Sequence, residues 1–460
     1  MLARSAITRR SLLQIGSVGL GGLTLPGVLR SAENSSQRPA PRAKACILLY
    51  MDGGPSQIDL FDLKPEAPAE IRGPWQPIAT SAEGVQIGEL LPCLARQMHR
   101  VLLVRSVRHE ETVHDPAVYQ MLTGYKHVSS AGGLKVEETD HPHMASGFLR
   151  ADPRAAAMPA AIQLPETMKM EGRVLPGQNG GILGATFDPF LVELTPEGRV
   201  LPPDFVRQRE IGGTRHSQRS QLLSRFNREL GRLEAVATTE RLSRFQQQAL
   251  SILAAPSIQQ AFDLSLESPE THARYGRHRH GQSVLLARRL VEAGSRFVTV
   301  YWGREEQDWA DGVKGRFANN PWDTHRNHFP LLKETLAPRA DQTLAALLSD
   351  LGDRGLLDET LVVWMGDFGR TPRISQPWRS RDHWPDAFSM LLAGAGVKAG
   401  TIHGRTDHHA AQVTDDPVSP ADITATLLDT LGLNPHLEVE ATSGRHHRLS
   451  TGRIVREWFA

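Results

Sequence analysis

The chain has 460 residues, enough to bury a large core as one big α/β domain or as two domains. Lys and Arg total 52 and Asp and Glu total 51, so no global field favours nucleic acid or an anionic membrane surface. The 19 histidines, many of them beside acids, are more informative, because neutral imidazole is the commonest metal ligand in proteins. Of the two cysteines, Cys46 lies in an apolar stretch and is expected to be a small buried hydrophobe.

The N-terminus indicates where the protein goes. Arg9 and Arg10 stand directly before a weakly apolar, glycine-rich stretch, and residues 31–42 form a polar, proline-containing linker. This arrangement resembles a twin-arginine export signal, and the alternative is an amphipathic N-terminal helix. We expect residues 1–43 to be signal and linker, with export through the twin-arginine machinery to the periplasm. An uncleaved signal that anchors the protein in the membrane stays open.

After the linker, strand-like and helix-like segments alternate along one expected domain, residues 44–460. The predicted elements, in chain order, are strand 45–50, strand 101–104, helix 116–122, strand 160–164, helix 283–293, strand 296–300, helix 331–351, strand 360–365, strand 388–393 and helix 420–431. Residues 209–253, rich in Arg, Glu, Gln and Leu, are expected to be a helical insertion or cap. The alternation predicts an α/β fold with a mostly parallel sheet and helices on both faces.

Acids and histidines gather in four short segments far apart in the sequence, and two of these follow predicted strands. The candidate metal ligands are Asp52, Asp323, His325, His328, Asp367, Asp382 and His383. Because sites in open α/β sheets are built at the carboxyl ends of strands, we expect these segments to meet there. Carboxylates and imidazoles together suit one or two divalent metals. The alternatives are that Asp52 and Asp367 cap helices and that the histidines are hydrogen-bonded loop residues.

Two further residues are candidates for catalysis. Arg370 follows Asp367 closely and is suited to binding a sulfate, phosphate or carboxylate oxygen, with a structural salt bridge as the alternative. His114 precedes the predicted helix at 116–122. It has three possible roles: a nucleophile, a general acid or base, or an additional metal ligand.

The order of the motifs resembles the alkaline phosphatase superfamily, which includes sulfatases and phosphodiesterases. More closely, the chain resembles a twin-arginine-exported, sulfatase-like family with an uncharacterised domain. The phrases that carry this resemblance are Trp322-Asp323-Thr324-His325, Gly366-Asp367-Phe368-Gly369-Arg370-Thr371-Pro372 and Arg381-Asp382-His383-Trp384. The resemblance implies a three-layer sandwich. It also implies metal ligands at Asp52, at Asp323 with His325 or His328, at Asp367 and at His383.

The chain departs from the superfamily pattern at three positions. Phe368 stands where a ligand histidine usually follows the aspartate. His114 occupies the position of the cysteine that becomes formylglycine in type I sulfatases, and Val118 replaces the nearby arginine. Neither Cys46 nor Cys93 lies in such a motif, so a formylglycine mechanism is excluded.

Two functional hypotheses follow. The first is an exported hydrolase of sulfate or phosphate esters, of small molecules or polysaccharides, that uses zinc, calcium, manganese or magnesium to activate water. The second is a non-catalytic, metal-binding scaffold of the same fold, which the three departures favour. A phosphomutase is a weaker third reading, because export argues against it.

Overall fold

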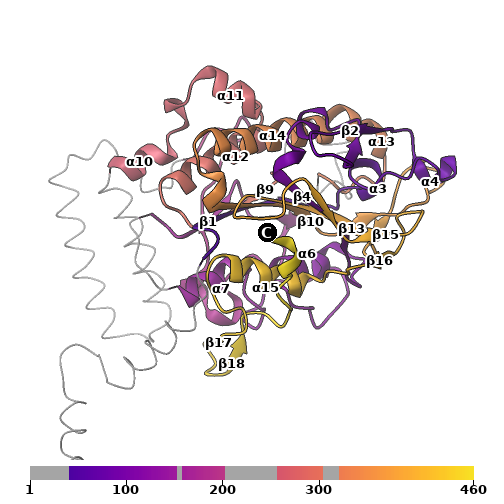
Figure 1. The fold of residues 1–460 in the computed structure, drawn as a ribbon. Helices are drawn as coiled ribbons and strands as arrows, with labels where there is room; N and C mark the ends of the chain where they lie inside the picture. Colours follow the sequence, from indigo (N-terminus) through magenta and orange to yellow (C-terminus); the bar gives the residue numbers. More distant parts are fainter. Residues whose placement is uncertain (1–40, 153–157, 202–255, 304–320) are drawn as a thin grey trace, which may run out of the picture.

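The computed structural model describes residues 41–152, 158–201, 256–303 and 321–460, and its centre is an eight-stranded sheet (Figure 1). The strand order is β14-β4-β13-β10-β1-β9-β5-β8. All neighbours pair in parallel except at β13, which runs antiparallel to both β10 and β4. The strands of this sheet are β1 Ala45–Met51, β4 Val101–Val107, β5 Ala161–Leu164, β8 Phe190–Leu191, β9 Phe297–Tyr301, β10 Thr360–Gly366, β13 Phe388–Ala393 and β14 Thr401–His403.

Helices cover both faces of the sheet, as the alternating pattern predicts. The helices are α3 Gln57–Leu60, α4 Ala69–Arg72, α5 Pro92–Ala95, α6 His114–Thr123, α7 Met144–Ala151, α10 Pro256–Phe262, α11 Pro269–Tyr275, α12 Arg279–Glu292, α13 His328–Leu331, α14 Ala337–Asp353 and α15 Pro420–Thr430. In Figure 1, α11, α12 and α14 lie above the sheet, and α6, α7 and α15 lie below it. Each layer of helices packs on its own apolar cluster against the sheet. The predicted three-layer α/β architecture is therefore confirmed.

Short two-stranded sheets lie outside this central sheet. They are β2 Pro77–Ala79 with β3 Gln86–Gly88, β6 Lys169–Met170 with β7 Arg173–Val174, β11 Gly369–Arg370 with β12 His383–Trp384, β15 Arg405–Thr406 with β16 Val413–Asp415, and β17 Glu438–Glu440 with β18 His446–Arg448. The pair β11–β12 matters most for the site, because it places Arg370 directly opposite His383.

The predicted helix 331–351 is in fact interrupted. Between α13 and α14, residues Leu332–Leu336 form a π-helical turn, and Pro338 lies in the first turn of α14. Proline has no N–H to donate to the preceding turn, which accounts for a break in the regular α-helical hydrogen bonding at this point. The predicted helical segment 209–253 and the predicted signal lie outside the described residues. Among the residues that are described, we find no helix with the length and apolarity needed to cross a bilayer.

The central strands deliver two carboxylates to one edge of the sheet. Every side chain of β1 and β10 is buried, because both strands are covered on both faces and consist mainly of apolar residues. Their register pairs Met51 with Gly366, so the next residues along the two strands, Asp52 and Asp367, emerge side by side.

The burial of His143 below the sheet predicts that the stability of the protein depends on pH. His143 caps α7: its Nδ1 accepts a hydrogen bond from the backbone N–H of Ala145 at 2.9 Å, and burial lowers its pKa to about 3. In the unfolded chain this imidazole takes up a proton near its ordinary pKa of about 6.5. The unfolded state therefore binds more protons between these two values. Stability is lost as pH falls through this window, by up to about 1.4 kcal/mol per pH unit for this one group.

Urea unfolding at several pH values from 7 to 4 measures this effect. His143→Asn keeps a side chain suited to capping and removes the titration, so its stability is expected to fall less steeply with acid. Equal slopes for the two proteins would contradict the assignment.

Candidate metal centre

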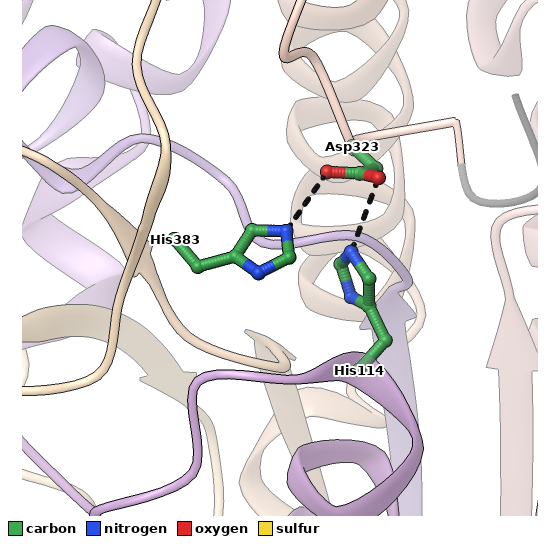
Figure 2. Close-up of side chains that lie close together, drawn as sticks. All are labelled: His114, Asp323 and His383. Carbon is green, nitrogen blue, oxygen red and sulfur yellow. Dashed lines mark hydrogen bonds and ion pairs between the residues drawn. The ribbon is translucent and has the colours of Figure 1, made fainter. Parts of the chain in front are cut away.

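Three histidines converge on Asp323, which lies in the loop before α13. Nε2 of His114 lies 3.2 Å from Oδ2 of Asp323, and Nε2 of His383 lies 3.2 Å from Oδ1 (Figure 2). His325 joins them, with its Nε2 3.1 Å from Oδ1 of Asp323 and 2.8 Å from Nε2 of His383. The fold therefore brings together side chains from three segments that are far apart along the chain.

The second nitrogen of each histidine is already engaged. In all three rings Nδ1 faces an oxygen that accepts hydrogen bonds: Oδ2 of Asp367 at 2.7 Å from His114, Oδ1 of Asp382 at 2.8 Å from His325, and the carbonyl oxygen of Thr112 at 2.7 Å from His383. Nδ1 is accordingly the protonated nitrogen of each neutral ring. In the neutral form of each ring, Nε2 then directs a lone pair toward the Asp323 carboxylate. Outer hydrogen bonds of this kind orient the histidine ligands of metal sites.

The spacing of these atoms fits a tetrahedral ion. Zinc binds histidine nitrogen and carboxylate oxygen at about 2.0–2.1 Å, which places tetrahedral ligand atoms roughly 3.3 Å apart. Oδ1 of Asp323 and the Nε2 atoms of His325 and His383 are separated by 2.8–3.2 Å. The ligand atoms of His114, Asp323 and His383 also all lie within 4.8 Å of one another. A small outward movement of the side chains would accommodate an ion.

The charges around the centre keep Asp323 ionised. Although burial opposes ionisation, His114 and Arg370 hold the pKa of Asp323 well below its usual range. Burial likewise disfavours a charged His114, but Asp323 and Asp367 outweigh it and raise the pKa of His114 to about 9. For His383, burial dominates and lowers the pKa to about 4, so this imidazole is neutral and able to act as a ligand at pH 7.

Arg370 lies inside the protein rather than facing substrate. Its side chain is fully buried. Its guanidinium donates to the carbonyl oxygens of Gly54 at 2.9 Å and Trp322 at 2.8 Å, to that of Gly53, and to Oδ1 of Asp323 at 2.9 Å. These bonds hold the Asp323 loop against the end of β1. This bonding within the chain corresponds to the structural salt bridge expected as the alternative role of Arg370.

The aromatic ring of Phe368 covers one side of the centre. The ring of Phe368 is buried and packs against His114 at 4.9 Å and His383 at 4.3 Å between ring centroids. A hydrocarbon surface here lowers the local dielectric and strengthens the electrostatic interactions of the centre.

The remaining predicted ligands lie around this cluster. Asp367 is buried; its Oδ2 accepts from the backbone N–H of Gly53 at 3.1 Å as well as from His114, and its Oδ1 is buried without a hydrogen bond within the described part of the chain. Asp52 is buried beside Asp367. Burial and then these two carboxylates raise the pKa of Tyr50. Asp382 is more exposed and reaches the centre only through His325.

His328 points away from the cluster, although it belongs to the same predicted segment as Asp323 and His325. Its Nε2 lies 2.9 Å from Oδ2 of Asp59, and its Nδ1 lies 2.6 Å from Oγ1 of Thr324. The cause is local: Asn327 has φ 53°, a left-handed conformation that reverses the chain before α13 begins at His328. Both nitrogens of His328 are thus engaged outside the centre.

Sequence reasoning missed two groups that touch the centre or its loops. The carbonyl oxygen of Thr112 fixes the tautomer of His383, and Asp59 pairs with both His328 and Arg381. A backbone carbonyl has no signature in a sequence. Asp59 is preceded by Ser56 in a short helical segment and looks like an ordinary helix acid.

Comparison with known proteins identifies a family. One family, described as a protein of unknown function (DUF1501), matches residues 43–459. A comparison with curated proteins gives no match.

Several solved structures resemble the chain in fold. A phosphonate monoester hydrolase from Silicibacter pomeroyi shares 13% identity over 90% of this chain and 76% of that chain, with a TM-score of 0.43. A protein in the alkaline phosphatase superfamily from Vibrio parahaemolyticus shares 10% identity over 92% and 72%, with a TM-score of 0.40. A sulfatase from Pseudoalteromonas sp. shares 12% identity over 94% and 77%, with a TM-score of 0.37.

Proposed function

We propose a function for this chain, which belongs to the DUF1501 family of proteins of unknown function: it is a metal-dependent hydrolase of sulfate or phosphate esters. One observation carries the proposal. Three imidazoles, each with Nδ1 held by an acceptor, direct their Nε2 atoms at the single carboxylate of Asp323. The lone pair of a neutral imidazole that faces a carboxylate repels it unless a proton or a metal cation lies between them, and three nitrogens with one oxygen form a ligand set that suits zinc.

In this proposal His114, His325, His383 and Asp323 are the ligands of one divalent ion. Asp367 orients His114, which accounts for a histidine at the position where type I sulfatases carry cysteine. A second ion at the neighbouring strand ends would be held by Asp52 and Asp367.

A divalent ion held there would supply a Lewis acid that polarises the ester oxygens and activates water. The chain contributes the rest. Arg370 stabilises the ionised Asp323, and Phe368 excludes solvent from one side. Attack by water needs no covalent nucleophile, which agrees with the absence of a formylglycine motif around Cys46 and Cys93.

We further propose that the protein is exported through the twin-arginine machinery and acts outside the cytoplasm on a small-molecule or polysaccharide ester. The paired Arg9 and Arg10 before the apolar stretch support this. Export in the folded state would suit a protein that acquires its metal before it leaves the cytoplasm.

The test combines metal analysis with turnover. Natively exported protein is expected to contain one or two equivalents of divalent metal and to hydrolyse an aryl sulfate or aryl phosphate. Chelation should abolish the activity and added zinc should restore it. His383→Ala should lose both metal and activity, whereas His446→Ala, which removes an exposed histidine, should lose neither. Native protein without metal would overturn the proposal.

A non-catalytic scaffold is the second candidate, and one observation favours it. Arg370, the cation beside the centre, donates its hydrogen bonds within the protein. Stoichiometric metal with no turnover across sulfate, phosphate and phosphonate esters would select the scaffold.

A further inference from the structure

A second buried cluster joins the two loops that carry the metal ligands. Its centre is Asp59 on α3, which is fully buried. Arg381 donates to both carboxylate oxygens, from Nε to Oδ2 at 2.7 Å and from Nη2 to Oδ1 at 3.1 Å. His328 lies 2.9 Å from Oδ2 through its Nε2, and Ser56 donates to the same oxygen at 2.5 Å. All three of these partners are themselves buried polar groups.

The two main partners of Asp59 belong to the two loops. His328 directly follows the segment that presents Asp323 and His325, and Arg381 directly precedes Asp382 and His383. A third bond joins the same loops directly, because Ser380 donates from Oγ to the carbonyl oxygen of Thr324 at 2.7 Å. The Asp59 carboxylate thus contacts both loops, and Ser380 joins them directly.

The backbone of residues 71–73 lies in close contact with this ion pair. A Cβ placed on Gly73 would lie 2.8 Å from Oδ1 of Asp59 and 2.9 Å from Nη2 of Arg381, and Gly73 has φ 70°. The carbonyl oxygen of Ile71 accepts from Nη2 of Arg381 at 2.9 Å. Buried ion pairs of this kind often contribute little to stability compared with well-packed apolar residues. A role in fixing geometry explains its presence better than a role in stability alone.

We propose that Asp59 is a positioning residue of the metal centre: by binding Arg381 and His328 together, it holds the loop of His383 and the loop of Asp323 at ligand distance. This inference rests on the proposed metal binding. Asp59 itself contacts no ligand atom and acts through Arg381 and His328.

The experiment measures zinc affinity by competition with a chromogenic chelator, using the full chain. Asp59→Asn is expected to lower the affinity by about 10- to 100-fold, the range for outer partners of metal ligands. The visible spectrum of the cobalt-loaded protein should also change, because a displaced His383 alters the coordination geometry. Urea unfolding without metal measures the loss of stability separately.

The matched control is Asp350→Asn. Asp350 is also a buried carboxylate that binds two arginines and a hydroxyl, from Arg288, Arg354 and Tyr275, but it lies at the far end of α14. This variant should lose stability while keeping the zinc affinity and the cobalt spectrum. A purely structural role for Asp59 predicts the same behaviour for both variants, and that result would overturn the inference.

Other outcomes are also decisive. If native protein binds no zinc, the proposed function fails before Asp59 is tested. If Asp59→Asn does not fold, Arg381→Lys keeps a cation beside Asp59 and removes the paired Nε and Nη2 bonds to its two oxygens, and it should weaken zinc binding with the fold retained. Unchanged zinc affinity in a folded Asp59→Asn variant, or in Arg381→Lys where that variant must be used, would overturn the positioning role.

Discussion

Replacing Asp323 with asparagine is expected to abolish metal binding. The loss of affinity should exceed the roughly 100-fold loss that follows removal of a group that only hydrogen-bonds to a metal ligand. All three imidazoles converge on the Asp323 carboxylate, and both of its oxygens face histidine nitrogens. The substitution keeps the shape of the side chain but removes its charge. It also leaves the buried guanidinium of Arg370 without its anionic partner, and this positive charge would repel an incoming cation.

Competition titration with zinc measures the loss, and Asp382→Asn provides a graded comparison. Asp382 contacts the centre only through Nδ1 of His325, and it is largely exposed, so its removal should weaken binding by a much smaller factor. Wild-type affinity in Asp323→Asn would place the metal elsewhere in the protein.

The second large effect is expected for Gly53→Ala. Gly53 follows Asp52 at the end of β1 and has φ 114°, which side chains other than hydrogen rarely permit. An added Cβ would lie 2.6 Å from the carbonyl carbon of Trp322 and closer still to the backbone nitrogen of Asp323. The ligand loop would have to move away from the sheet. We expect a loss of about 3 kcal/mol or more of stability, from backbone strain and overpacking together, and a large loss of zinc affinity.

Gly294→Ala separates these two causes. Gly294 has a similar φ of 102°, but an added Cβ would meet no atom within 4 Å. Its substitution should therefore carry only the cost of the backbone strain, about 1–3 kcal/mol, and should leave zinc affinity unchanged. If the two variants lose the same stability and both bind zinc normally, the close approach of Gly53 does not determine the position of the Asp323 loop.

The sheet and the strand ends could be predicted because their signal is local. β1 and β10 are apolar runs buried on both faces, and each is followed at once by an acid, so the meeting of Asp52 and Asp367 follows from parallel pairing. The resemblance of the motifs to a known family added the order of the segments. Neither source predicts which nitrogen of a histidine faces which oxygen.

The details of the centre depend on contacts across long distances in the sequence. His114 meets Asp367 from 253 residues away, and a backbone carbonyl orients His383. Arg370 has the residue type of an anion-binding side chain, but its partners are mainly backbone carbonyl oxygens, which no residue pattern encodes. His328 shares a loop with Asp323, yet one left-handed residue, Asn327, turns it toward Asp59.

The spread of the centre along the chain has a consequence for biogenesis. His114, Asp323 and His383 come from three segments, and the last of them is made only when residue 383 of 460 has been synthesised. A ribosome-bound fragment that ends before this point lacks part of the centre. The proposed metal would therefore complete its ligand set only after most of the chain has been synthesised, and the bound ion would then tie its early and late segments together in the native state.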